Sequence, residues 1–483
     1  MIRELLRLRP GAEFTRSDAG ELTLSAPPHA ASLGPAGDAA YQALKLLADG
    51  PCDPAELPAA GPLLDRLRGG GWLVVDVATG DGPLYTLHPA RPPEVVPRGG
   101  DAAQLVLSRF VVLHRDGDHM VAESPVAAYD VHIQEPALLA AFAALARPVP
   151  ADGATLPLPA PVAARLLTDL RAAGLAVPAG GPEETELRLR QWSPFELWLH
   201  DRSRLGARAA ATGRWGPTGW LEADFPPLPA RPQPFGGPTV PLYRPDLAAL
   251  RATDPTFTAV LEDRRSVREH DADHPLHVEQ LGEFLYRCAR VRGVAVLDGI
   301  EHLDRPFPSG GAVHELEIYP VVNRVTGLAP GLYHYDGHEH RLEAVSGDGP
   351  AVRRLLELAE LATGATAPQV LLVVTARFGR LMTKYEGMGY AAILKDVGVL
   401  YQTMYGVATA MGLAPCGIGG GDAAVFNAAT GRDYLTESVV GEFLLGSRPA
   451  APDGRARHAP AGGAHDRDGA GQDGGAHAHD PAS

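Results

Sequence analysis

The segment LEDRRSVREH, residues 261–270, gathers guanidinium and hydroxyl groups in one place. It contains Arg264, Arg265, Ser266 and Arg268 at the end of a stretch with helical spacing. Guanidinium forks match phosphate oxygens bidentately, so this composition favours binding of a phosphate dianion. Arginine pairs are also common on solvated helix faces, and that alternative explains the cluster when it is taken alone.

A second candidate is the turn in RPFPSGGAVHELEIYPVV, residues 305–322. Pro308, Ser309, Gly310 and Gly311 predict a turn, which a short amphipathic segment and a strand then follow. Glycine has no Cβ atom, so N–H groups in this turn can approach a flat heterocycle or a phosphate closely. A tight turn entering a strand explains the same residues without a ligand.

A third region, residues 382–422, combines a helix with a glycine-rich exit. Apolar residues recur at spacings of four and three through residues 393–411, which predicts a long buried helix. The glycine run after it includes Gly419 and Gly420, whose amides could lie edge-on to a flavin, although a C-cap and turn is the alternative. The closing strand ends in Arg448, which could return to a cofactor phosphate.

These candidates fall in one predicted domain, residues 248–450. Residues 183–247 are interpreted as a connector, with Ser193 as a helix N-cap and a Pro-rich linker at 224–246 that cannot continue a helix or a central strand. Residues 451–483 are rich in Gly, Ala, Asp and His and predict a disordered tail, although a His tract can capture metal adventitiously.

The first 182 residues contain two segments of similar pattern, 1–95 and 96–182. Each is interpreted as a short hairpin, a helix, and a second helix that breaks at Gly into a strand. The constant offset of roughly 100 residues predicts a duplicated α+β unit that is similar to a winged helix. Such units serve as scaffolds, dimerisation units and peptide clamps as well as DNA readers, and the fold alone does not decide among these roles.

Composition excludes several classes of protein. A net charge of −15 disfavours neutralisation of nucleic-acid phosphates over a broad surface. The three cysteines, Cys52, Cys288 and Cys416, are too few and too far apart for a metal knuckle or a disulfide framework. No signal peptide and no apolar stretch of about 18 residues occurs, so we expect a soluble cytoplasmic protein that binds neither membrane nor nucleic acid and holds no metal.

Six segments in this order resemble the nitroreductase superfamily of FMN enzymes and, more narrowly, the SagB-type azoline dehydrogenases. They are RRSVR, PSGGAVHELEIY, GLYHYDGHEHRL, a Lys-Tyr pair before the buried helix, GLAPCGIGGGD and FLLGSRP. These enzymes oxidise thiazolines and oxazolines in ribosomally made peptides to azoles. The resemblance covers roughly residues 190–450. It implies an α+β protein in which tandem winged-helix-like units precede a nitroreductase-like FMN fold, an antiparallel sheet flanked by helices.

The resemblance also assigns roles, with FMN as the cofactor. The residues that match FMN-contacting segments of the family are Arg264, Arg265, Ser266, Arg268, Ser309, Gly310, Gly419, Gly420 and Arg448. Lys384 and Tyr385 match the catalytic Lys-Tyr pair. Two features depart from the family: Gly419 stands where many nitroreductases have Glu, and the helix after Tyr390 lacks the Ala-Gly-His sequence of many SagB-type relatives.

Azole formation removes a proton from one ring carbon and a hydride from its neighbour, so a base and a flavin are the minimum requirement. Neither a phenol nor an ammonium acts as a base at neutral pH unless its surroundings tune it, and the choice between Lys384 and Tyr385 stays open. The family resemblance further implies a homodimer, a precursor peptide as substrate and a cyclodehydratase partner. The alternatives are an NAD(P)H-dependent nitro or quinone reductase and a flavin-free scaffold that binds a peptide or a partner.

Overall fold

The computed structural model describes residues 1–26, 29–35, 37–57, 61–91, 102–204, 216, 218, 224–365 and 367–450. The predicted tail, 451–483, lies outside the described residues. Within the described part of the chain, no helix combines the length and the apolar character needed to cross a lipid bilayer.

The C-terminal half is built on a seven-stranded sheet with the order β13-β18-β17-β16-β19-β21-β20. Its strands are β13 (Thr239–Pro241), β16 (Leu316–Val322), β17 (Gly331–Asp336), β18 (Arg341–Gly347), β19 (Val370–Arg377), β20 (Leu413–Ile418) and β21 (Glu437–Ser447). All neighbouring pairs are antiparallel, which confirms the predicted antiparallel sheet. The Pro-rich linker contributes only β13, an edge strand, where a missing N–H donor is tolerated.

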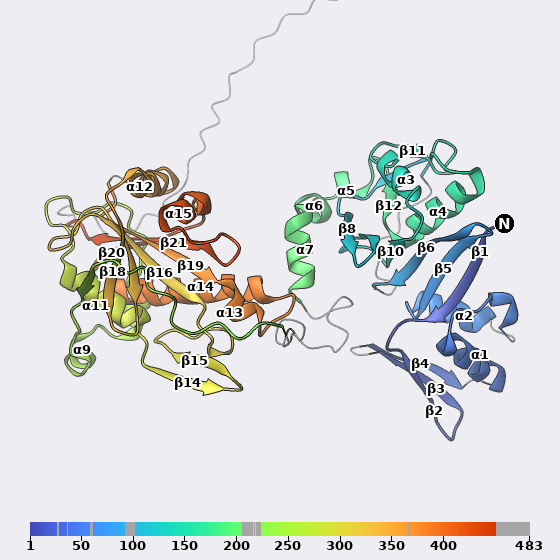
Figure 1. Cartoon of the computed structure of the whole chain (residues 1–483), viewed down its shortest axis with the longest axis horizontal. Coiled ribbons are helices and arrows are strands. Elements are labelled where there is room, and N and C mark those ends of the chain that lie inside the picture. The colour runs from blue at the N-terminus through green and yellow to red at the C-terminus, as the bar shows by residue number, and fades with distance from the viewer. Residues whose placement is uncertain are drawn as a thin grey trace, which may run out of the picture.

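Helices cover both faces of this sheet (Figure 1). One face packs against α11 (Val278–Ala289) and α14 (Gly389–Ala410), and the other against α12 (Pro350–Thr363) and α15 (Ala423–Thr430). Because both faces are covered, every residue of the central strand β19 is buried. Its side chains alternate between the two faces, so Leu372 packs on the α14 side and Leu371 on the α12 side. The long buried helix predicted from apolar spacing is confirmed as α14.

Short elements lead into the candidate site segments. They are α9 (Leu247–Thr253), α10 (Phe257–Asp263), the hairpin of β14 (Gly293–Leu297) and β15 (Ile300–Asp304), the 3₁₀ turn η3 (Gly310–Ala312) and α13 (Phe378–Met382). The helix α10 ends directly before Arg264, η3 contains Gly310, and α13 ends two residues before Lys384. Each candidate segment is therefore anchored to a regular element.

Strands from both predicted N-terminal units form one six-stranded sheet, with the order β1-β5-β6-β10-β9-β8. The strands β1 (Arg3–Leu8), β5 (Leu73–Thr79) and β6 (Gly82–Pro89) come from the first unit, and β8 (Val112–Asp116), β9 (His119–Glu123) and β10 (Tyr129–Ile133) from the second. The antiparallel pairing of β6 with β10 joins the two units.

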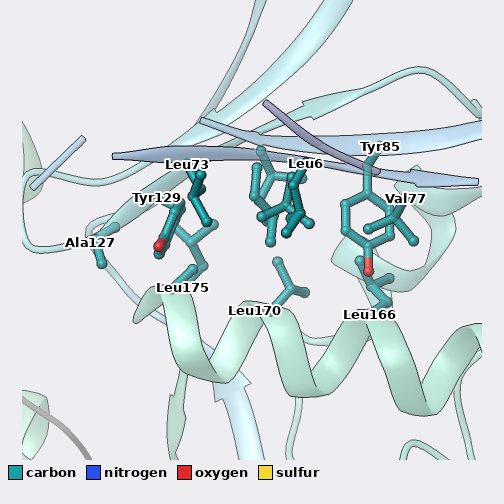
Figure 2. Close-up of a cluster of buried hydrophobic side chains, with 14 of the residues drawn as sticks. Leu6, Leu73, Val77, Tyr85, Ala127, Tyr129, Leu166, Leu170 and Leu175 are labelled. Atoms are coloured by element: carbon teal, nitrogen blue, oxygen red, sulfur yellow. The ribbon is translucent and has the colours of Figure 1, made fainter. Parts of the chain in front are cut away.

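A common hydrophobic core packs beneath this sheet. Figure 2 shows Leu6 and Tyr85, from strands of the first unit, facing Leu166 and Leu170 on α4 (Ala160–Ala173) of the second. The Tyr85 hydroxyl donates to the Asp169 carboxylate on the same helix at 2.6 Å. The domain boundaries drawn from the sequence stay a prediction, but the two units bury their apolar faces against each other.

The remaining N-terminal elements comprise those of the predicted pattern and others that the sequence did not predict. They are β2 (Glu13–Arg16), β3 (Glu21–Ala26), β4 (His29–Pro35), α1 (Asp38–Asp49), η1 (Pro54–Glu56), α2 (Gly61–Gly69), β7 (Gln104–Leu107), α3 (Leu138–Ala144), β11 (Val149–Pro150), β12 (Ala176–Pro178), α5 (Pro182–Thr185), α6 (Leu187–Arg190) and α7 (Pro194–Arg202). In both units a helix ends at Gly and leads into a strand, α2 into β5 and α4 into β12. Ser193 caps α7 as predicted, since its hydroxyl accepts from the Glu196 N–H at 3.3 Å.

Candidate functional site

Hydrogen bonds from two other segments hold the turn at residues 309–311. The Gly310 N–H donates to Asp396 Oδ2 on α14 at 2.8 Å, and the Gly311 carbonyl accepts from Lys384 Nζ at 3.1 Å. Ser309 Oγ accepts from the His314 N–H at 2.9 Å. The structure thus brings the predicted residues Ser309, Gly310 and Lys384 together.

Gly311 is required here for two reasons. Its φ of +59° lies in the left-handed region, which favours glycine. A Cβ at this position would also lie 2.4 Å from Lys384 Nζ, too close for any real contact. The absence of a side chain at Gly311 is therefore what admits the Lys384 side chain to the turn.

Lys384 and Tyr385 lie between α13 and α14. Both backbone N–H groups donate to the Leu381 carbonyl at 3.0 Å, which fixes the start of this segment to α13. The Tyr385 ring lies 3.5 Å from the place that a Cβ on Gly310 would occupy. Both side chains are half-buried, so they keep a fixed position and remain accessible from solvent.

Glu315 and Asp396 form a buried carboxyl pair behind the turn. Glu315 is fully buried and Asp396 is 7% exposed. Burial, followed by the charge of Asp396, raises the pKa of Glu315 to about 8. Burial likewise raises the pKa of Asp396 above its ordinary value. Because two adjacent buried carboxylates repel each other, the pair retains a proton near neutral pH.

Sequence reasoning missed both carboxyl groups as site residues. Asp396 interrupts the apolar spacing of α14 and lies on its buried face beside Ile393 and Val397. An acidic residue on such a face is seldom found without a function or a partner, so this signal was available. Glu315 gave no comparable signal, because an acid just before a strand is ordinary.

The phosphate-binding candidates gather around Tyr405, near the C-terminal end of α14. The Tyr405 hydroxyl contacts Ser266 Oγ at 2.8 Å and accepts from the Gly417 N–H at 2.7 Å. The Arg264 guanidinium carbon lies 5.4 Å from the centre of the Tyr405 ring. Tyr405 was not singled out from the sequence, since a Tyr in an apolar helix is most often a core residue.

Backbone hydrogen bonds align the segment 264–271 with the edge of the sheet. The Val267 N–H donates to the Pro415 carbonyl on β20 at 2.8 Å, and the Asp271 N–H donates to the Ser447 carbonyl on β21 at 3.1 Å. The second bond brings this segment beside Ser447, the neighbour of Arg448. The predicted arginines at both ends of the domain therefore lie along one sheet edge.

The arginine side chains at this edge are open to a ligand. Among the described residues, Arg265 donates only to the backbone carbonyls of Glu262 and Arg264, each at 2.7 Å. Arg268 and Arg448 are exposed, and within the described residues neither forms a hydrogen bond or an ion pair. Cations without partners beside a hydroxyl fit a phosphate dianion, which would supply the missing acceptors.

Gly419 and Gly420 form the exposed loop between β20 and α15. A Cβ on either residue would meet nothing within 4 Å, and within the described residues neither N–H group forms a hydrogen bond. The next residue, Gly421, is packed against Glu442 so closely that a side chain could not fit. Burial raises the pKa of Glu442 to about 7. The open amides fit the edge of a flat ring.

The candidate residues thus form two groups along α14. Asp396, in the first group, and Tyr405, in the second, are separated by nine residues, or roughly 14 Å of helix. Within the described residues, no hydrogen bond or ion pair joins the two groups. The residues of the second group fit FMN, with cations for its phosphate and free amides for its ring; the first group presents Lys384 and Tyr385.

Two protein-family models match the chain. Residues 105–209 match the cyanobactin oxidase ThcOx, and residues 261–446 match the nitroreductase family. The second match contains every candidate site residue except Arg448.

Individual proteins are also similar to parts of the chain. A protein of Methanocaldococcus jannaschii that is named as a nitroreductase is 28% identical over 183 residues, covering 38% of this chain and 85% of that protein. The trifolitoxin-processing protein TfxB of Rhizobium leguminosarum bv. trifolii is 30% identical over 132 residues, covering 26% of this chain and 35% of that protein. The chain thus spans about a third of the length of TfxB. Among solved structures, a chain of the E. coli microcin synthetase McbBCD complex with truncated pro-MccB17 bound has a TM-score of 0.33 and 19% identity, covering 48% of this chain and 91% of that one.

Proposed function

Because residues 261–446 form a nitroreductase-family domain, we propose that the chain is an FMN-dependent dehydrogenase that oxidises azolines to azoles in a ribosomally synthesised precursor peptide. The observation that carries this proposal is the placement of Lys384 and Tyr385 against the 309–311 turn. The similarity of residues 105–209 to a cyanobactin oxidase, and of the chain to a trifolitoxin-processing protein, supports a peptide-borne substrate. Thiazoline and oxazoline are both within the proposal.

When bound, FMN accepts the hydride that leaves one ring carbon. The chain's own groups take the proton from the neighbouring carbon and hold the ring in place. Either Lys384 or Tyr385 is the base. The hydrogen bond to the Gly311 carbonyl orients Lys384 Nζ, and the Tyr385 ring lies beside Gly310 in the same turn. The protonated Glu315–Asp396 pair keeps the turn in position without adding two negative charges next to the base.

We assign the FMN phosphate and ribityl chain to Arg264, Arg265, Ser266, Arg268 and Arg448 at the β20 edge. In this proposal the amides of Gly419 and Gly420 face the ring, and Ser309 and Gly310 line it. These two groups are separated along α14 in one chain. A homodimer resolves the separation, because the turn of one copy can complete the flavin site at the sheet edge of the other.

The N-terminal half would supply affinity for the peptide. A single azoline ring offers few contacts, and a second binding site on the same chain raises the effective concentration of the ring at the catalytic site. Residues 105–209 would hold the leader of the precursor or dock a cyclodehydratase partner. The three free thiols, Cys52, Cys288 and Cys416, are consistent with the reducing cytoplasm as the place of action.

The test is a mass measurement on azoline-containing peptides incubated with the full chain and FMN. Each ring oxidised makes the product lighter by two hydrogen atoms, about 2 Da. We expect Lys384→Ala and Tyr385→Phe to bind FMN and remain yellow, but to lose this mass change. Lys395→Ala and Tyr390→Phe, which alter exposed residues of the same types on α14, are the matched controls. Full turnover by both Lys384→Ala and Tyr385→Phe would disprove the assignment.

A nitro or quinone reductase that uses NAD(P)H is the second candidate. It is favoured by the 28% identity to a nitroreductase-named protein across 85% of that protein. Rapid NADPH oxidation with a nitroaromatic acceptor, together with no azole formation from any azoline peptide, would establish this alternative. A colourless chain that cannot be reconstituted with FMN would instead indicate a flavin-free scaffold.

A further inference from the structure

We propose that a pocket on the α12 and α15 side of the sheet binds the carboxylate of a small ligand. The pocket has a volume of about 370 Å³, within the usual range of small-molecule sites. Its walls come from β16, β17 and β18, from residues 337–338 between β17 and β18, from Arg305 directly after β15, and from residues 231–234 of the connector. This site shares no residue with the flavin or catalytic groups, so the inference does not rest on the proposed oxidation.

Two of the three carboxylates in the walls are already satisfied by nearby groups. Asp336 pairs with Arg231 at 2.5 Å and with Arg341 at 3.2 Å. Glu343 accepts a hydrogen bond from the Gly236 N–H at 2.7 Å. Neither acid therefore needs a cation from a ligand.

Glu317, the third carboxylate, is almost fully buried and is also compensated. It lies 3.3 Å from His334 Nε2 and 3.6 Å from Arg377 Nη1. Burial opposes ionisation of Glu317, but the hydrogen bond with His334 and the charges of His334, Arg305 and Arg377 hold its pKa below the ordinary value. The carboxylate is therefore ionised and neutralised by the chain itself.

Arg305 is the buried cation in the wall that forms no ion pair within the described residues, although its charge helps to lower the pKa of Glu317. It is 6% exposed, and its Nη1 donates to the Leu316 carbonyl at 3.2 Å. Its Nε has no hydrogen-bond partner, and in the described part of the chain no carboxylate forms an ion pair with it. A buried guanidinium without a paired anion is costly, and a bound carboxylate would remove that cost.

A histidine in the wall adds a second hydrogen-bonding nitrogen to that of Arg305. His338 Nε2 also lacks a hydrogen-bond partner within the described residues. Burial lowers the pKa of His338, so this ring is neutral and can donate without adding charge. A planar carboxylate matches the guanidinium fork of Arg305.

The connector that forms part of the wall is itself fixed to the domain. Arg377 donates to the carbonyls of Pro229 and Ala230, each at 2.8 Å, and the Ala230 N–H donates to Glu301 at 2.6 Å. The pocket is thus a built cavity rather than a gap under a loose loop. Its carboxylate could come from a free small acid or from the end of a peptide.

Titration calorimetry of the full chain tests the site, with acetate and succinate as free acids and a tripeptide in its acid and amide forms. Sodium chloride at matched ionic strength corrects for general salt effects. We expect Arg305→Gln to weaken carboxylate binding by about tenfold or more. Arg354→Gln, exposed on α12, should bind as the unaltered chain does. Binding by the acid tripeptide alone would identify a peptide end, and binding by acetate or succinate a free acid.

Equal binding by Arg305→Gln and the unaltered chain would overturn the proposal, as would the absence of binding for every carboxylate up to about 10 mM. If Arg305→Gln does not fold, His338→Ala at the half-buried position serves instead. It should weaken binding severalfold, and unchanged affinity in that variant would count equally against the site.

Discussion

The two ends of α14 are prepared for chemistry in different ways. At the N-terminal end, Lys384 is already bonded to the Gly311 carbonyl and Asp396 to the Gly310 N–H. At the C-terminal end, Arg268 and Arg448 are exposed and unpaired within the described residues. Side chains that hydrogen bonds already hold in place need no rearrangement when a substrate binds. Exposed cations without partners, in contrast, can form their hydrogen bonds with an anionic ligand. The comparison teaches that one end is suited to catalysis and the other to holding a charged cofactor.

Gly311→Ala tests the ordered end and should have the largest effect. The added Cβ would meet Lys384 Nζ at 2.4 Å, and the φ of +59° would strain any other residue. We expect azole formation at saturating FMN to fall by about a hundredfold or more, because the displaced base no longer meets the ring. Single-turnover mass spectrometry measures this rate.

The control for that substitution is Gly398→Ala on α14, where a Cβ meets nothing within 4 Å. It should retain the full rate. An undiminished rate in Gly311→Ala would show that the position of Lys384 does not matter for the reaction, and the contrast between the two ends would disappear.

The double substitution Arg268→Gln with Arg448→Gln tests the open end. Loss of two cations should raise the Kd for FMN by about tenfold to a hundredfold. The difference in Kd between this variant and the unaltered chain should be smaller at high salt, since salt screens exposed charges. Quenching of flavin fluorescence on binding provides the measurement, and the rate at saturating FMN should stay close to that of the unaltered chain.

Arg251→Gln with Arg353→Gln removes the same charge from exposed positions on α9 and α12 and is the matched control. If the Arg268 and Arg448 variant instead lost turnover at saturating FMN as severely as Gly311→Ala, the assignment of catalysis to one end of α14 and cofactor binding to the other would be wrong.

Glu315→Gln tests the N-terminal end of α14 through the pH dependence of the stability of the folded chain. The pKa of Glu315 is raised from an ordinary 4.5 to about 8, first by burial and then by Asp396. The unfolded chain therefore loses this proton above about pH 4.5 while the folded chain keeps it to about pH 8, so the folded state loses stability as pH rises through that window. Tm measured from about pH 5 to pH 8 should fall less steeply in Glu315→Gln, which cannot ionise. Glu357→Gln, exposed on α12, should keep the original slope, and an unaltered slope in Glu315→Gln would contradict the buried acid.

The sequence predicted the elements of this site better than their assembly. Apolar spacing is a local signal, so it located α14, and the glycines marked the turn at 309–311, where the backbone conformation of Gly311 favours glycine. The coupling of Glu315 with Asp396 depends on two segments far apart in the chain, and no local pattern reports such a meeting. The sequence placed the Lys-Tyr pair before this helix and the glycine run after it, but it did not reveal that the 309–311 turn lies against Lys384 or that the arginine segment lies beside Tyr405.

The N-terminal half shows the same difference between local patterns, which the sequence predicts, and long-range contacts, which it does not. Hairpin and helix patterns predicted two similar units. The pairing of β6 with β10 and the shared core around Leu170 are long-range features, and they follow from apolar faces that neither unit covers alone.

Tyr405→Phe is expected to have the smallest effect and tests how firmly the open end is built. The phenyl ring would keep its packing against Phe443, whose ring centre lies 5.1 Å away, and would keep Arg264 nearby. The lost hydroxyl would leave the Gly417 N–H and the Ser266 hydroxyl without this shared partner. Loss of one hydrogen bond should lower the free energy of unfolding by about 1 kcal/mol, which corresponds to a decrease in Tm of about 2–4 °C.

Tyr405→Phe should also weaken FMN binding a few-fold, because Ser266 would be held less firmly beside the arginines. Tyr434→Phe, at a position that is 59% exposed, is the control for both measurements. If the two variants matched in Tm and in FMN affinity, the hydroxyl would not be what ties the arginine segment to β20. In that case the backbone hydrogen bond from Val267 to Pro415 would be enough to hold the arginine segment in place. The arrangement of the arginines would then depend on strand β20 and not on α14.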